Sequence, residues 1–147
     1  MIELQTFVLA GKAEFTLTSR YSGKHYTFQV NKAKENPRYP GKTWFVNYMV
    51  SYDEYKYLGI LKGDAIILNL TAKSHAGEES PVFKIFTAFW KLARNGAYDW
   101  EGTPHGDQQM IRFQHVGRCC VCARPLTNPM SIDMGIGPEC LSKIGGE

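Results

Sequence analysis

The strongest constraint on the fold is the alternation of apolar and polar residues through the first half of the chain. Residues 14–18 and 26–30 alternate with a period of two, which is typical of strands that bury one face. A turn containing Gly23 separates them, so we expect an antiparallel hairpin. After a proline-containing loop over 31–43, three more strands are predicted at 44–50, 55–61 and 65–71. These segments predict a small antiparallel sheet or a partly open barrel.

The pattern becomes helical after these strands. Ser80 is a suitable N-cap, Pro81 suits the first turn, and apolar residues then recur at spacings of three and four until Gly96, which is expected to end the helix. The apolar stripe is expected to cover one face of the sheet, which makes residues 1–96 an α+β body. Residues 97–114 are rich in Gly, Pro and polar side chains and are interpreted as a linker.

All four cysteines lie in the remaining segment, 115–147. Cys119 and Cys122 form a C-x-x-C pair, whose two thiolates can hold one zinc ion from a single tight turn. Cys140 lies 18 residues after Cys122, where a Gly-Ile-Gly-Pro turn is expected to lead into a short helix. A tetrahedral site needs a fourth ligand, and the nearest candidate is a histidine. The segment is therefore predicted to be a zinc finger, with Cys120 spare and the ligands His115, Cys119, Cys122 and Cys140.

Other interpretations of the cysteines stay open at this point. A redox C-x-x-C would open a helix, whereas Pro125 interrupts one here, and a disulfide is disfavoured because the chain begins without a secretory signal. A catalytic zinc would keep an open coordination position, which is possible if His115 is not a ligand. His105, Asp133 or another oxygen donor could then take the fourth position.

The cysteine segment also carries a dense motif. It is Cys-Cys-Val-Cys-Ala-Arg-Pro-Leu-Thr-Asn-Pro-Met-Ser over 119–131, followed by Gly-Ile-Gly-Pro-Glu-Cys over 135–140. This motif resembles a small zinc-finger-like family of unknown function from phage and bacterial proteins, with Ala123 in place of the commoner Gly. The preceding body is similar to the N-terminal part of several phage-encoded members. The resemblance implies a phage-type accessory protein, cytoplasmic in an infected bacterial host, and supplies no activity.

The charge distribution points to a partner. The net charge is only +3, but residues 12–42 contain seven Lys or Arg against two acidic residues, while residues 115–147 are neutral. Eleven of the 19 aromatic residues lie between Phe15 and Tyr57. Aromatic rings beside cations hold single-stranded nucleic acids on small sheets, although rings at alternate strand positions also form cores. We therefore predict binding of single-stranded DNA or RNA by Arg20, Tyr21, Lys24, Tyr26, Lys32, Lys34, Arg38, Tyr39, Lys42 and Trp44.

The two other function classes are a protein-interaction module and an enzyme. The alternative is a protein-interaction module that binds or inhibits a host protein, such as a host defence component. Its expected contacts are Met130, Ile132 and Met134, although these side chains could equally pack within the finger. An enzyme is not expected, because the chain has no P-loop, dinucleotide fingerprint, nucleophile elbow or His-Glu-x-x-His motif. No apolar run reaches the length that spans a bilayer, so no membrane partner is expected.

Overall fold

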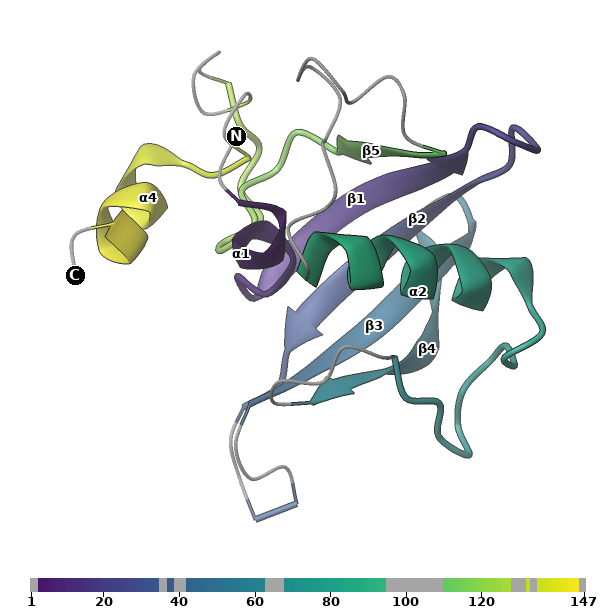
Figure 1. Cartoon of the computed structure of the whole chain (residues 1–147). Coiled ribbons are helices and arrows are strands. Elements are labelled where there is room, and N and C mark those ends of the chain that lie inside the picture. The colour runs from purple at the N-terminus through teal and green to yellow at the C-terminus, as the bar shows by residue number, and fades with distance from the viewer. Residues whose placement is uncertain are drawn as a thin grey trace.

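The protein is built around a five-stranded antiparallel sheet, with its first helix and its long central helix packed on one face (Figure 1). It is described by a computed structural model that covers residues 3–34, 37–38, 42–62, 68–94, 110–127, 132 and 135–145. The strand order is β4-β3-β2-β1-β5. The predicted α+β class is confirmed, and the sheet is open. The elements are α1 (Leu4–Val8), β1 (Lys12–Ser19), β2 (His25–Lys32), β3 (Thr43–Ser51), β4 (Glu54–Lys62), α2 (Pro81–Arg94), β5 (Ile111–His115) and α4 (Pro138–Gly145).

The first four predicted strands are confirmed as β1 to β4. Of the fifth, expected over 65–71, residues 65–67 lie outside the described residues, and Asn69 forms only an isolated bridge with Ile60. The remaining edge of the sheet is instead occupied by β5, which pairs antiparallel with β1. Residues 111–114, interpreted from the sequence as the end of the linker, are therefore part of the sheet.

The predicted helix is confirmed as α2. Ser80 caps it, since its Oγ accepts a hydrogen bond from the N–H of Phe83 at 3.3 Å and donates one to the carbonyl of Gly77 at 2.6 Å. Lys91 and Arg94 lie in the last turn, where cations complement the helix dipole. Gly96 lies outside the described residues. The buried face of the helix consists of Val82, Ile85, Phe86, Phe89, Trp90 and Ala93.

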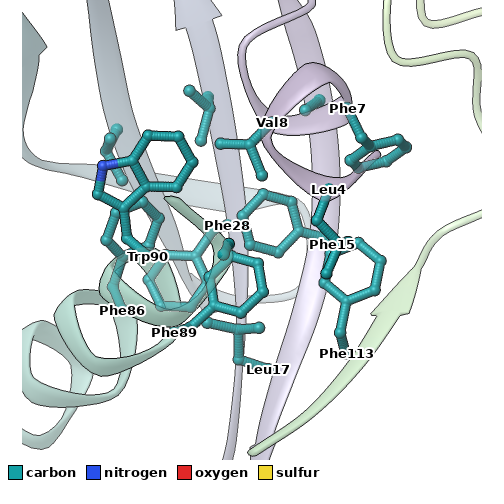
Figure 2. Close-up of a cluster of buried hydrophobic side chains, with 14 of the residues drawn as sticks. Leu4, Phe7, Val8, Phe15, Leu17, Phe28, Phe86, Phe89, Trp90 and Phe113 are labelled. Carbon is teal, nitrogen blue, oxygen red and sulfur yellow. The ribbon is translucent and has the colours of Figure 1, made fainter. Parts of the chain in front are cut away.

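The core between α2 and the sheet is aromatic (Figure 2). Phe15, on β1, lies near its centre and is fully buried. Its ring centroid is within 6.4 Å of five other phenylalanine rings, contributed by α1, β2, α2 and β5. This one residue therefore links most elements of the fold. The five rings belong to Phe7, Phe28, Phe86, Phe89 and Phe113.

Within the described parts of the chain, none of the helices has the length and apolar character needed to cross a bilayer.

Candidate functional site

Three cysteines come together in the C-terminal segment. The Sγ atoms of Cys119, Cys122 and Cys140 all lie within 4.8 Å of one another. Around a tetrahedral zinc ion with Zn–S bonds of about 2.3 Å, sulfur atoms are about 3.8 Å apart, so small side-chain rotations would complete such a site. Thiolates favour soft or borderline metals such as zinc over magnesium or calcium. The donor set therefore fits a metal ion, as the spacing predicted.

The C-x-x-C turn is closed by backbone hydrogen bonds. The N–H of Cys119 donates to the carbonyl of Arg124 at 2.9 Å, and the N–H of Ala123 donates back to the carbonyl of Cys119 at 2.8 Å. Arg118 and Pro125 form an isolated bridge at the open end of the turn. This small hairpin carries two of the three sulfur atoms on one tight turn.

Ala123 occupies a left-handed conformation in this turn, with φ of +63°. Left-handed backbone costs an L residue about 1–2 kcal/mol, whereas glycine adopts it freely. We expect Ala123→Gly to stabilise the metal-loaded protein by about 0.5–1 kcal/mol, after the greater freedom of glycine in the unfolded chain is subtracted. Urea unfolding of the two proteins measures this difference, and a less stable glycine variant would contradict the strain argument.

The third cysteine is delivered by α4. A turn precedes the helix at Gly135, where φ is +75°. The carbonyl of Gly135 accepts a hydrogen bond from the N–H of Cys120 at 3.1 Å, and the N–H of Leu141 donates to the carbonyl of Gly137 at 2.9 Å. The first bond ties the residues before α4 to the C-x-x-C turn, and the second begins the helix that carries Cys140.

The electrostatics of the cluster favour a bound cation. Burial raises the pKa of Cys119, but backbone N–H groups of Gly137, Cys122 and Val121 directed at its sulfur outweigh this effect, so its pKa lies below the ordinary value. Burial, followed by hydrogen bonds with the other two thiols, raises the pKa of Cys140 to about 11. Three thiolates this close repel one another, and a divalent ion removes that repulsion.

Cys120 does not belong to the cluster. Its side chain is fully buried in the core, and burial raises the pKa of its thiol to about 12. Its backbone has a structural role, because its carbonyl accepts a hydrogen bond from the N–H of Lys12 at 2.8 Å. The prediction that this cysteine is spare agrees with its absence from the group.

His115 is expected to be the fourth ligand. It does not belong to the three-cysteine cluster that the described residues form. Its Nδ1 accepts a hydrogen bond from the N–H of Gly117 at 3.0 Å, which leaves the proton on Nε2 to donate to the carbonyl of Ile132 at 2.6 Å. Both ring nitrogens are thus engaged with backbone groups. The reserve candidates His105 and Asp133 lie outside the described residues.

The cluster is joined to the body of the protein through α1. The Phe7 ring contacts His115 at 5.9 Å between centroids, and it also packs on Phe15 and Phe113 of the sheet. A Cβ placed on Gly135 would lie 2.7 Å from the Phe7 ring, so only glycine permits this approach. The cysteine segment and the sheet therefore share one core.

Comparison with known proteins identifies one part of the chain. Residues 112–145 match the model of a family of unknown function, DUF6011. These residues, called the DUF6011 segment below, contain β5 except Ile111, all four cysteines and α4. No curated protein and no solved structure matches the chain.

The predicted nucleic-acid-binding residues divide into two groups. Arg20, Tyr21 and Lys24 lie in the β1–β2 hairpin, next to Tyr26 at the start of β2. The eight residues of β2 span about 23 Å at about 3.3 Å per residue. The basic stretch is therefore not one continuous patch. The second group, at and after the other end of β2, consists of Lys32, Lys34, Arg38 and Lys42, all exposed.

One of the predicted aromatic contacts, Trp44, is not an exposed ring. Trp44 is only 4% exposed, and its Nε1 donates a hydrogen bond to the carbonyl of Leu9 at 3.0 Å. It is a core residue, because it lies on the face of β3 that packs toward the helices, so the expectation of an exposed ring does not hold. Tyr39 lies outside the described residues.

The hairpin group forms a groove with α2. A pocket of about 400 Å³ is lined by Tyr21, Lys24 and Tyr26 on one side and by Pro81, Lys84 and Ile85 on the other. Tyr21 is 88% exposed, whereas Tyr26 packs partly against the core. Sequence reasoning missed the α2 wall, since residues about sixty positions apart give no local signal that they meet. The hairpin groove, as we call this pocket, also includes Ser19, Ser22, Glu79, Met110 and Ile111.

Proposed function

We propose that the protein is a non-enzymatic binding module in which one zinc ion fastens the DUF6011 segment and the hairpin groove binds single-stranded nucleic acid. The observation that supports nucleic-acid binding is the hairpin groove. Its lining includes two tyrosine rings and two lysines, one lysine from the hairpin and one from α2. Stacking rings beside cations are how small sheets hold bases and phosphates together.

Zinc is the metal that this cluster supports best. Three cysteine thiolates from a tight turn and a helix are a common donor set for structural zinc, which binds four ligands. Its role here would be to hold α4 against the C-x-x-C turn, because the segment has little core of its own. The fourth position falls to an oxygen donor, a water molecule or a histidine. His115 would have to give up the bond from the Gly117 N–H to coordinate through Nδ1, and Nε2–H could still donate to the Ile132 carbonyl.

The groove's side chains suggest how a strand would lie. The exposed Tyr21 ring offers a face for one base, while Lys24 and Lys84 flank it for phosphates. Glu79 lies 3.8 Å from Lys84 in an exposed pair, which salt and water screen. Each phosphate contact releases counterions, so affinity should fall steeply as the salt concentration rises.

The test is binding of fluorescent single-stranded DNA and RNA at low salt. Tyr21→Ala removes the stacking face and should weaken binding about tenfold, since one stacked base contributes about 1–3 kcal/mol. Lys24→Glu should weaken it further and reduce the salt dependence. Tyr52→Ala is the matched control, because Tyr52 is 96% exposed on the β3–β4 hairpin beside acidic residues. Equal losses for Tyr21→Ala and Tyr52→Ala, or no binding at low salt, would refute the proposal.

Protein binding is the second candidate, favoured by exposed apolar side chains in the DUF6011 segment. Val116 and Ile132 are each 39% exposed, and His115 connects them by its bond to the Ile132 carbonyl. Met130 and Met134, the other expected contacts, lie outside the described residues. A host protein that binds the purified chain directly after nuclease treatment, and is lost with Ile132→Asp, would support this candidate.

A further inference from the structure

A second pocket opens on the sheet face opposite α2. Phe45 and Ile60 are paired across β3 and β4, and they alternate with the buried Trp44, Val46 and Leu61, which face the helices. Their side chains therefore point to the other side of the sheet. There they line a pocket of about 480 Å³, a size typical of sites for small molecules. The described residues that line it are Arg38, Phe45, Tyr57, Ile60, Thr71, Ala72 and Lys73.

One wall of this pocket is fixed to β4 by hydrogen bonds. Ile60 and Asn69 exchange two backbone bonds of 2.9 Å, which hold the segment after β4 against the strand. Gly59 permits this approach, because a Cβ there would lie 2.5 Å from the Asn69 carbonyl oxygen. The Thr71 hydroxyl then donates to the Tyr57 hydroxyl at 3.1 Å and orients that ring. The aromatic ring and the segment are thus positioned together.

The turn that carries Lys73 is also ordered by its own bonds. The N–H of Ser74 donates to the carbonyl of Thr71 at 3.0 Å, and the N–H of Thr71 donates to Ser74 Oγ at 2.9 Å. The N–H of His75 donates to the carbonyl of Tyr57 at 2.8 Å and closes the far side of the turn. The lysine therefore stands at the pocket on a defined support.

We propose that this pocket binds one nucleotide, with its base against Phe45 and Tyr57 and its phosphate near Arg38 and Lys73. The two rings meet edge to face, with centroids 6.2 Å apart and planes at 69°, so they offer apolar surface in two directions. Among the described residues, the lining contains two cations and no carboxylate, which complements an aromatic anion. None of these residues lines the hairpin groove, so the inference does not rest on the proposed function.

The experiment is an NMR titration of the full-length, zinc-loaded protein. The probes are AMP, ribose 5-phosphate and an oligothymidylate of about ten nucleotides. AMP should shift the amides of Tyr57, Ile60 and Lys73 and bind more tightly than ribose 5-phosphate, which lacks the base. Lys73→Glu should weaken AMP about fivefold or more and Phe45→Ala about tenfold, the effect of one lost stacking contact. Lys91→Glu, on α2 at the opposite face, should leave binding unchanged.

The outcomes separate the possible ligands. Shifts in the pocket with AMP identify a free nucleotide as a ligand, and shifts with oligothymidylate alone identify a nucleotide within a strand; both support the site. The exposed Lys73 lies on a turn, so Lys73→Glu tests the site even if Phe45→Ala does not fold. The site is refuted if neither probe shifts these amides at millimolar concentration, or if Lys73→Glu binds as the unaltered protein does. Oligothymidylate shifts confined to the hairpin groove, with no AMP shifts in the pocket, would refute this site and leave the proposed function standing.

Discussion

Cys119→Ala is expected to lose the bound zinc and to unfold the DUF6011 segment. Cys120→Ala should keep the zinc and the folded segment. Cys119 is one of the three clustered sulfur ligands, while its neighbour points into the core outside the cluster. Zinc binding by small fingers contributes about 10–16 kcal/mol to folding, so loss of one thiolate should cost several kcal/mol. Deleting the buried sulfur of Cys120 should cost only about 1 kcal/mol.

Two measurements follow this pair of variants. Metal analysis by mass spectrometry gives the zinc content per chain, and NMR spectra of α4 and the C-x-x-C turn report whether the segment is ordered. Chelation of the unaltered protein should reproduce the spectrum of Cys119→Ala. If Cys119→Ala retains stoichiometric zinc, or if both variants behave alike, the three-cysteine site is wrong.

Phe15→Ala is expected to destabilise the whole domain by about 3–5 kcal/mol, the usual cost of deleting a buried phenylalanine. Phe15 contacts rings from four other elements, so the cavity would lie at the centre of the core and could not collapse easily. The total stability of a domain is about 5–15 kcal/mol, and such a loss could leave a large unfolded fraction.

Phe83→Ala is the matched control for this core variant, because Phe83 is only partly buried on α2. Its loss should cost about 1–2 kcal/mol, since much of the side chain already contacts water. Urea unfolding followed by circular dichroism measures both values. A Phe15→Ala variant no less stable than Phe83→Ala would contradict the described core.

The main elements were predictable because their signals are local. Alternating strands and a capped amphipathic helix are visible within ten to fifteen residues, and they became β1 to β4 and α2. Helix α1 has five residues and no side-chain cap, and it gains its stability from burial of Leu4, Phe7 and Val8. Strand β5 is as short, and its partner β1 is about ninety residues away. Both depend on tertiary contacts that no local pattern reveals.

The candidate sites likewise include features that local sequence reveals and features that only the fold creates. The three clustered cysteines were predicted, since ligand spacing is a property of the sequence. His115 was chosen for its nearness to Cys119, but backbone groups occupy both of its nitrogens in the fold. The basic stretch was visible as composition, yet the length of β2 decides that its charges form two groups. The pocket at Phe45 was missed, because its lysine comes from a distant turn.

The most direct test of the metal centre is X-ray absorption at the zinc edge of the purified protein. One zinc per chain is expected, with three sulfur neighbours at about 2.3 Å and a fourth, lighter ligand. Imidazole scattering would identify that ligand as histidine, and its absence would favour oxygen. A folded protein that contains no metal, or a zinc ion with fewer than three sulfur neighbours, would contradict the three-cysteine centre.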